Sequence, residues 1–225
     1  MEMKADLKET YRKNPFRILS ASPGDPREAL IRLQGDQALF GDAAESARAL
    51  AELLHPESRL EAEMRWFPQT DRALIDRLFA WLDLPRSEKT LPRLILPCHL
   101  ANFNYVRLVL SEFPIGSTAQ LHAVLRSLSV AADALLPRQV MAEINGDRNK
   151  AGFALLSDTD AVVSQLRALF TETVRFTVSR SGPAAFAGLR ALSGELKKDY
   201  TDRSSPYHGS FLLRVASEDL MRPAR

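Results

Sequence analysis

Histidine and cysteine are the side chains most often used for metal binding or nucleophilic catalysis, and this 225-residue chain has few of them. The four histidines and the single cysteine are His55, His99, His122, His208 and Cys98. No histidine has a second histidine or cysteine three or four residues away, which is the spacing that a metal site on one helix needs. We therefore predict no metal site and no bound cofactor, and we interpret the histidines as structural or surface residues.

Cys98 and His99 are adjacent, but they do not have the arrangement of a catalytic pair. Neighbouring residues on a helix point to different sides, so the thiolate–imidazole contact of a cysteine nucleophile is not expected. We interpret Cys98 as a small core residue. The sequence also lacks the G-x-x-x-x-G-K-[ST], G-x-G-x-x-G and G-x-S-x-G patterns. We predict that the protein is not an enzyme, while an active site assembled from residues distant in sequence stays open as an alternative.

The balance of charges gives no indication of a nucleic-acid partner. The chain has 30 Lys and Arg residues against 28 Asp and Glu, whereas a dedicated polyphosphate binder is strongly basic. Residues 175–225 are mildly basic, with 9 basic and 5 acidic side chains. An acidic partner or RNA could contact the basic residues near this end: Lys197, Lys198, Arg203, Arg214, Arg222 and Arg225. We favour a solvated helix face for them, because no aromatic platform is interleaved for base stacking.

Composition also bears on where the protein is found. A hydrophobic fraction of 45% and a charged fraction of 26% are typical of a folded, soluble protein. The single cysteine excludes an internal disulfide and fits a reducing compartment. The first 14 residues are charged throughout, without the apolar core of a signal peptide, and no run approaches the ~20 apolar residues of a membrane span. We therefore expect a cytoplasmic protein that has no membrane as a partner.

Residues 14–67 contain start and stop signals for three helices. Asn14 followed by proline is typical of a helix start, so a short helix is expected over residues 16–19. Asp25 and Asp42 each stand three residues before a glutamate, the spacing of a capping box, and they predict the starts of the second and third helices. Helical spacing predicts the inner faces as Ala29, Leu30, Leu33, Gln37 and Phe40 in the second helix, and Ala47, Leu50, Leu53 and Leu54 in the third. Gly35, in the middle of the second helix, indicates close approach by another backbone, a bend, or simple tolerance, which we favour.

Two segments of this region resemble the J-domain family of chaperone cofactors. Residues 14–19, NPFRIL, are similar to the family's opening helix, with its aromatic-x-hydrophobic-Leu pattern. Residues 54–59, LHPESR, are similar to the Leu-x-Asp-Pro-x-x-Arg segment late in the family's third helix, with His55 where Asp is usual. The resemblance covers residues 14–67, roughly a quarter of the chain, and it implies a J-like three-helix unit.

The resemblance ends at the residues that carry the family's activity. In the family, a His-Pro-Asp tripeptide between the second and third helices stimulates ATP hydrolysis by the large heat-shock chaperone. The corresponding loop here, at about residues 41–44, reads GDAA, and the similar His55-Pro56-Glu57 lies at the wrong place, on the helical side of its segment. We interpret the region as a degenerate J-like domain, for which the resemblance implies the fold but not the activity.

Four residues are candidates for partner binding. Arg27 and Arg32 lie on the second helix, through which the resemblance implies contact with a heat-shock ATPase. Asp36 and Asp42 weaken that attraction to an acidic partner. Trp66 and Phe67 end the J-like unit and are large enough to dock a partner; docking within the chain is the alternative, which we favour.

Beyond Pro68 the sequence predicts only further helices, and we divide the chain into domains of residues 1–69 and 70–225. Helices are expected from Leu74 to Leu82, after Pro97, from Ser117, after Pro137 with an end at Asn145-Gly146, and over residues 160–180, 183–200 and 206–221. No segment alternates convincingly with period two, and no fixed repeat is evident. The predicted fold is therefore all-α, with an N-terminal J-like three-helix unit followed by an irregular helical bundle.

From these features we predict a non-catalytic cytoplasmic adaptor, a protein-interaction module whose partner is another protein. A recognisable scaffold without its active tripeptide, and the lack of a catalytic motif, support this prediction. Two alternatives stay open. The chain could be a chaperone cofactor that acts with a bacterial heat-shock ATPase, or an enzyme whose site is built from distant residues.

Overall fold

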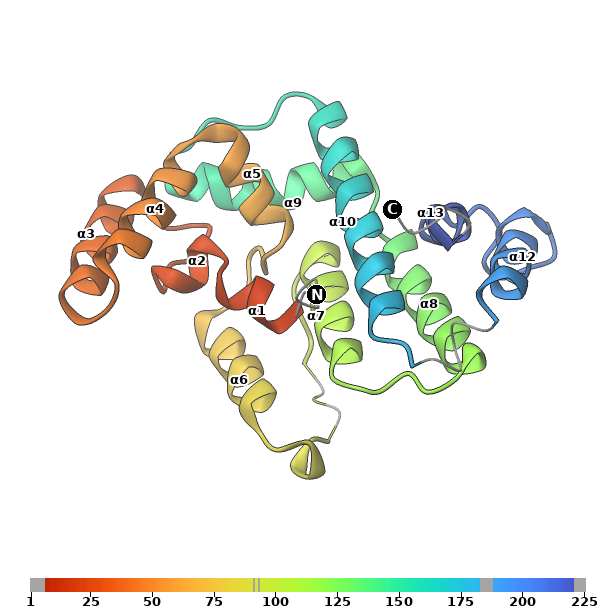
Figure 1. Cartoon of the computed structure of the whole chain (residues 1–225). Coiled ribbons are helices and arrows are strands. Elements are labelled where there is room, and N and C mark those ends of the chain that lie inside the picture. The colour runs from red at the N-terminus through yellow and green to blue at the C-terminus, as the bar shows by residue number, and fades with distance from the viewer. Residues whose placement is uncertain (1–6, 91, 93, 183–187, 221–225) are drawn as a thin grey trace.

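The computed structural model describes residues 7–90, 92, 94–182 and 188–220 (Figure 1). Over these residues the chain has helices and no strand, apart from an isolated bridge between Ile115 and Ser181. The all-α prediction is therefore confirmed. The α-helices are α1 (Leu7–Arg12), α2 (Pro15–Ile18), α3 (Arg27–Phe40), α4 (Ala43–Leu54), α5 (Pro56–Met64), α6 (Arg72–Asp83), α7 (His99–Ser111), α8 (Thr118–Asp133), α9 (Pro137–Ala151), α10 (Thr159–Ser179), α12 (Leu189–Thr201) and α13 (Phe211–Leu220). A short 3-10 helix, η1 (Arg86–Glu88), follows α6.

Two of the predicted helix starts in the N-terminal region are confirmed by their capping contacts. The Asn14 side chain accepts a hydrogen bond from the backbone N–H of Phe16 at 3.0 Å, and Pro15 opens α2. The same side chain donates to the carbonyl of Ala62 at 3.0 Å, which ties α2 to α5. The Asp42 carboxylate accepts from the N–H of Ala44 at 2.8 Å and so caps α4. Local capping chemistry therefore determines both starts.

The predicted start and inner face of α3 are partly wrong. Asp25 does not cap the helix, because its carboxylate accepts from the N–H of Ser22 at 2.7 Å and closes the preceding turn instead. The N-cap position is taken by Pro26, which has no side-chain acceptor. Leu30 is buried as predicted, but Phe40 is 91% exposed. On α4, Ala47 is exposed as well. Both helices present their predicted faces only in part.

The predicted third helix is divided into α4 and α5 at His55. The backbone of His55 is extended, with φ −89° and ψ 127°, and Pro56 begins α5. Proline has no N–H to donate to the preceding turn, so it suits the first position of a new helix better than the interior of an old one. The segment His55-Pro56-Glu57 thus lies at a helix junction and not inside a helix.

Two hydrophobic cores hold the helices together. The first is formed by α1 to α6 with one side of α7, and includes Leu30, Leu53 and Leu78. The second is formed mainly by α8, α9, α10, α12 and α13, and includes Leu125 and Leu169. Helix α7 contributes residues to both cores. Residues on both sides of the predicted boundary at residue 70 share the first core, and the division into two domains there stays a prediction.

One helix in the C-terminal half ends later than expected. Helix α9 does not end at Asn145-Gly146 but continues to Ala151, where Gly152 takes a left-handed φ of 70°. The Asn145 side chain holds the backbone of Leu156 by two hydrogen bonds of 2.8 and 2.9 Å, so this asparagine serves a tertiary contact. A Cβ at Gly146 would lie 2.8 Å from the side chain of Gln69. The glycine therefore gives room for a neighbouring chain segment.

The start of α7 agrees with the helix expected after Pro97, and the described residues between 92 and 97 are not helical. Helix α7 begins at His99, and its first N–H groups are capped from another helix. The Glu143 carboxylate on α9 accepts from the backbone of His99 at 2.9 Å and of Leu100 at 3.1 Å. A carboxylate at a helix N-terminus satisfies unpaired donors and is favoured by the helix dipole.

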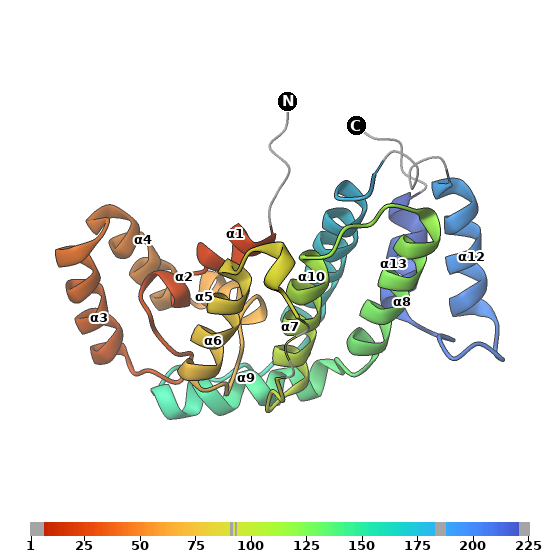
Figure 2. The ribbon, with the colours of Figure 1, turned by 90° about the horizontal axis from the view of Figure 1, so that it is seen from below.

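The ends of the molecule are formed by different helices. Figures 1 and 2 show α3 at one outer edge, beside α4, and α12 and α13 at the opposite end. Helix α3 packs chiefly against α4, whereas α12 packs chiefly against α13. In the described ranges, none of the helices is both long enough and apolar enough to cross a membrane.

Candidate functional site

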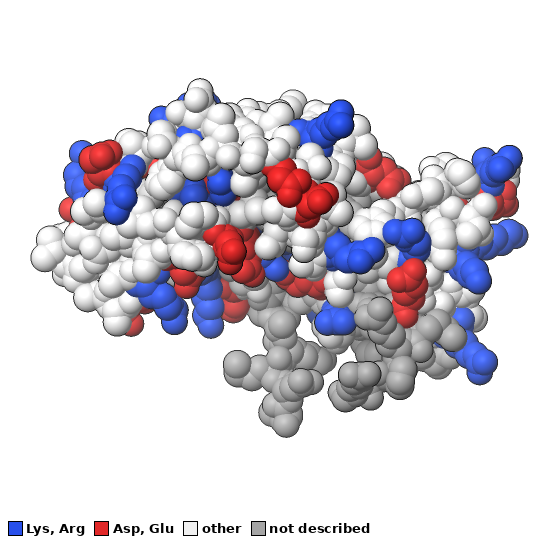
Figure 3. All heavy atoms as spheres, turned by 90° about the horizontal axis from the view of Figure 1, so that it is seen from above, with Lys and Arg blue, Asp and Glu red and all other residues white. Residues whose placement is uncertain are grey.

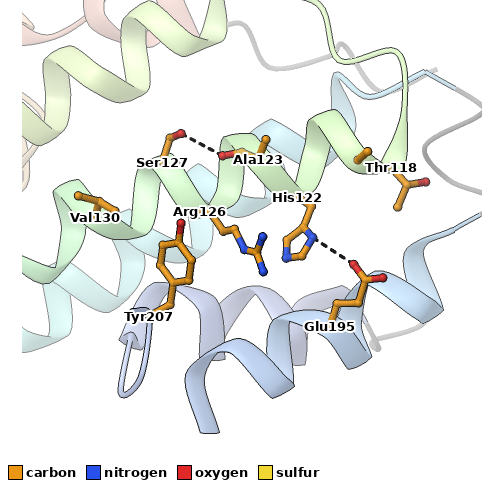
Figure 4. Close-up of a pocket in the computed structure, with 9 residues that line it drawn as sticks. Thr118, His122, Ala123, Arg126, Ser127, Val130, Glu195 and Tyr207 are labelled. Atoms are coloured by element: carbon orange, nitrogen blue, oxygen red, sulfur yellow. Dashed lines mark hydrogen bonds and ion pairs between the residues drawn. The ribbon is translucent and has the colours of Figure 1, made fainter. Parts of the chain in front are cut away.

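An open groove of about 660 Å³ lies between α8 and α12 (Figure 4). Helix α8 contributes one wall, α12 contributes Glu195, and the segment before α13 contributes Tyr207. The lining from α8 consists of Thr118, Ala119, His122, Ala123, Arg126, Ser127 and Val130. This combination of an imidazole, a guanidinium and hydroxyl groups makes the groove the strongest candidate for an active site assembled from distant residues.

An ion-pair cluster crosses this groove from α8 to α12. The His122 ring lies between two carboxylates, with Nε2 2.8 Å from Asp199 and Nδ1 3.0 Å from Glu195. Arg126 donates two hydrogen bonds to Asp199, at 2.6 and 2.9 Å. Burial opposes ionisation of Asp199, but hydrogen bonds from Arg126 and His122 hold the pKa of its carboxyl below the ordinary value. The cluster therefore fastens α12 to α8.

The same contacts occupy the groups that catalysis would need. Both ring nitrogens of His122 have a carboxylate partner, so neither is available to take a proton from a substrate. The Ser127 hydroxyl donates to the carbonyl of Ala123 at 3.0 Å. Among the described residues, no group of three His, Cys, Asp or Glu side chains is placed to hold a metal ion. We interpret the cluster as a joint between two helices.

Cys98, His99 and His55, the other cysteine and histidine residues considered for chemistry, also have local partners. Burial raises the pKa of the Cys98 thiol to about 12, so the thiolate is scarce at neutral pH, and Cys98 is a core residue as predicted. The His99 ring contacts Glu143 at 2.9 Å. His55 is exposed, and its ring lies 3.4 Å from the Ser58 hydroxyl.

Trp66 and Phe67 are not available to a partner protein. They are 1% and 0% exposed. Their rings pack within the chain, Trp66 with Phe16 at a centroid separation of 6.2 Å and Phe67 with Tyr11 at 5.5 Å. The favoured alternative, docking within the chain, is what the structure contains. Stacked aromatic rings of this kind stabilise a core, and here they join α1, α2 and the segment after α5.

Arg27 and Arg32, in contrast, are exposed on α3. Around them lies an exposed surface that helical spacing did not predict. We call it the outer face of α3 and define it by Ile31, Arg32, Gly35, Asp36 and Leu39, while Phe40 is exposed at the end of the helix on another side. Ile31 is 48% exposed, Leu39 78% and Phe40 91%. Ile31 and Leu39 share one face, and Phe40 adds a third exposed apolar side chain at the end of the same helix. Large apolar side chains gathered in the solvent-exposed part of one helix are typical of interaction sites.

The mildly basic C-terminal part forms the opposite end of the molecule. Figure 3 shows Lys and Arg side chains over the end that α12 and α13 make. Of the predicted basic residues, Lys197, Lys198, Arg203 and Arg214 are exposed, and Arg222 and Arg225 lie outside the described residues. The exposed ones stand on the solvent side of these helices or in the segment between them.

No protein-family model matches the chain, and comparisons with curated proteins and with solved structures find no match either. The functional argument therefore rests on the residues and their geometry. The groove between α8 and α12 and the outer face of α3 are the two surfaces to weigh. The groups of the first are paired with one another, whereas the apolar side chains of the second are open to solvent.

Proposed function

We propose that this protein is a non-catalytic adaptor that binds another protein through the outer face of α3. The observation that carries this proposal is the exposure of Ile31, Leu39 and Phe40 on a helix that packs chiefly against one neighbour. Burying an exposed Leu or Phe side chain contributes about 1.5–3 kcal/mol. A partner that covered these side chains would therefore gain substantial free energy.

The charges on this face indicate what kind of surface the partner has. Arg32 and Asp36 flank the apolar residues, so the face is apolar in the middle and carries both signs of charge at its side. Interfaces with an apolar centre and a polar rim are typical of specific protein complexes. The partner is thus expected to offer an apolar surface with charges of both signs beside it.

The resemblance of residues 14–67 to the J-domain family also supports the proposal. A short helix, α2, is followed by α3 and α4, which are joined by the two residues Gly41 and Asp42 and pack against each other. The resemblance assigns α3 to the family's second helix, which is its partner-binding helix. In this proposal the chain keeps a binding helix in a cytoplasmic adaptor and has lost the tripeptide that acts on ATP hydrolysis.

A site-specific photo-crosslinker tests the proposal. Leu39 is replaced by p-benzoylphenylalanine in the full chain, the cells that express it are irradiated, and the adducts are separated by mass. We expect a discrete protein adduct. The matched control carries the crosslinker at Leu155, which is 54% exposed in the segment between α9 and α10, and it should give none. Equal adducts from both positions, or none from position 39, would show that α3 is not a docking helix.

A chaperone cofactor is the second candidate, because Arg27 and Arg32 are both exposed on α3. Asp36 and Asp42 on or next to the same helix reduce its attraction for an acidic ATPase surface. The tight Gly41-Asp42 connection contains no His-Pro-Asp tripeptide. We therefore expect no stimulation of single-turnover ATP hydrolysis by a bacterial heat-shock chaperone. A several-fold increase that Arg32→Ala abolished would favour the cofactor over the adaptor.

A further inference from the structure

We propose that the ion-pair cluster between α8 and α12 is a pH-sensitive joint. While the His122 ring is protonated, it holds Glu195 and Asp199 of α12. When the ring loses its proton, Glu195 is released and α12 is held less firmly against α8. The inference concerns the end of the molecule opposite α3, so it does not depend on the proposed function. It follows from the contacts of the ring, the different attachment of the two carboxylates, and the charges around them.

The contacts of His122 require the protonated form of its ring. Nε2 lies 2.8 Å from a carboxylate oxygen of Asp199, and Nδ1 lies 3.0 Å from one of Glu195 (Figure 4). A carboxylate only accepts hydrogen bonds, and a neutral imidazole has one N–H and one unprotonated nitrogen. With a neutral ring, one of the two contacts would bring an unprotonated nitrogen against a carboxylate oxygen. Only the imidazolium, with a proton on each nitrogen, satisfies both contacts.

The two carboxylates are held to different degrees, and this difference determines which one is released. The Asp199 side chain is 11% exposed and accepts two further hydrogen bonds from Arg126, at 2.6 and 2.9 Å. The Glu195 side chain is 61% exposed, and within the described part of the chain His122 is its only ion-pair partner. A neutral ring therefore keeps its N–H on Asp199, while Glu195 turns into solvent. Helix α12 then stays attached to α8 at one position instead of two.

The charges around the ring balance only when it is protonated. Together with Arg126 and the two carboxylates, a protonated His122 gives a cluster without net charge, whereas a neutral ring leaves one negative charge in excess. The adjoining cleft adds Lys198 and Asp202, which have opposite signs, and Tyr207 adds a hydroxyl group to the groove. Helices α7, α10 and α13 also pack against α8, but their described residues line neither the groove nor the cleft.

The direction of the pH effect follows from the charge of the ring. Histidine changes its charge between about pH 5 and 8, whereas lysine and arginine stay charged over this range. Burial opposes ionisation of Asp199, but hydrogen bonds from Arg126 and His122 hold the pKa of its carboxyl below the ordinary value, so this group stays ionised. The joint therefore stabilises the folded chain at the acidic end of the range, and this contribution is lost as the pH rises.

Hydrogen exchange of the α12 backbone amides tests the inference. It is measured by mass spectrometry on the full chain at about pH 5.5 and about pH 8, on either side of the histidine titration. After correction for the intrinsic pH dependence of exchange, the protection of α12 should fall by about threefold at the higher pH, the size expected for a partly exposed ion pair. His122→Gln has no ring to protonate, so its protection should be equal at both pH values. A response that is absent in the unaltered chain, or that survives His122→Gln, overturns the inference.

Two controls separate the joint from a general effect of pH on the protein. The amides of α6, which belongs to the other core, should not follow the protonation of His122. His99→Gln is the matched variant, because the His99 ring also contacts a carboxylate, that of Glu143 at 2.9 Å, but lies on α7. This variant should keep the pH response of α12. If it removes the response as His122→Gln does, the effect is global and the joint is not its source.

Glu195→Gln tests which carboxylate the proton serves. Glutamine keeps the length of the side chain but has no charge, and at this exposed position an unaltered circular dichroism spectrum is expected. The protection of α12 at the acidic pH should fall to about the level of the unaltered chain at the basic pH. Lys198→Gln removes an exposed charge of the same helix outside the cluster and should leave the pH response in place. A full response in the Glu195→Gln variant would show that the ring acts through Asp199 alone, which overturns the release of Glu195.

Discussion

The two helices of the N-terminal hairpin, α3 and α4, use their apolar residues in different ways. On α4 the buried residues Ser46, Ala49 and Leu53 lie on one face, toward the core. On α3 only Leu30 is fully buried, while Ile31, Leu39 and Phe40 face solvent. Both helices have similar lengths and lie side by side, so the contrast comes from their sequences. The contrast indicates that the apolar face of α4 stabilises the core, whereas several apolar residues of α3 do not contribute to it.

The C-terminal ends of α4 and α3 also differ in how they are held to the rest of the protein. The carbonyl of Leu53, in the last turn of α4, accepts a hydrogen bond of 3.2 Å from the guanidinium of Arg59. Arg59 is buried and pairs with Glu63 at 2.8 Å, and Glu63 pairs with Arg148 of α9 at 2.8 Å. The end of α3, at Gly41, is capped only by its own backbone. Helix α4 is thus anchored to the body of the protein, and α3 is attached through α4.

The largest effect is expected where this anchor is broken. Glu63→Ala leaves the guanidinium groups of Arg59 and Arg148 buried without their shared counter-charge. Removing one member of a buried pair costs about 3–5 kcal/mol of unfolding free energy. In a chain of this size, the melting temperature should fall by roughly 10 °C, which thermal circular dichroism measures.

Glu61→Ala on the same helix is the control for this change. Glu61 is exposed and pairs with Arg65 at 3.2 Å at the surface, so its loss should cost about 0.5 kcal/mol. If both variants have the same melting temperature, the buried pair does not anchor α4.

The next effect compares the same substitution on the two helices. Leu53→Ala removes a fully buried side chain of α4 and leaves a cavity, so we expect a loss of about 2–5 kcal/mol in urea unfolding. Leu39→Ala on α3 removes an exposed side chain and should change stability by about 0.5 kcal/mol or less. A similar loss in the two variants would mean that the outer face of α3 is part of the core.

The sequence predicted helices well where the signal was local. Asn14 and Asp42 begin α2 and α4 because each side chain reaches an N–H two residues later. Asp25 and Asn145 carry the same kind of signal but have other partners, a turn and the backbone of Leu156. A capping residue identifies a site where a helix can start or stop, and competing hydrogen bonds decide whether it does.

The candidate sites could be predicted only in part. Arg32 is exposed as expected, but helical spacing assigned Phe40 to the core. Spacing gives the side of the helix on which Phe40 lies, but it does not show whether another segment covers that side at the helix end, and Phe40 is 91% exposed. His122 and Asp199 are 77 residues apart and meet only through the packing of α8 with α12. A pattern within one segment contains no information about such a contact.

A smaller effect is expected from the cap that separates the two helices. Asp42→Ala removes the acceptor for the first N–H groups of α4 and should cost about 1 kcal/mol, measured by urea unfolding. Asp42→Ser keeps a capping oxygen and should recover most of that loss. An unaltered midpoint in the alanine variant would show that packing alone begins α4.

The smallest effect is expected at Phe40, and it provides the strictest test of the contrast between α3 and α4. Replacing a buried phenylalanine by alanine would lower the free energy of unfolding by about 3–5 kcal/mol. With its side chain 91% exposed, Phe40→Ala should change the unfolding free energy by no more than about 0.5 kcal/mol, measured by urea unfolding. Trp66→Ala is the opposite control, because that aromatic ring is buried and its loss should cost the full amount. A large loss at Phe40 would return this residue to the core, and α3 would then lack its most exposed apolar side chain.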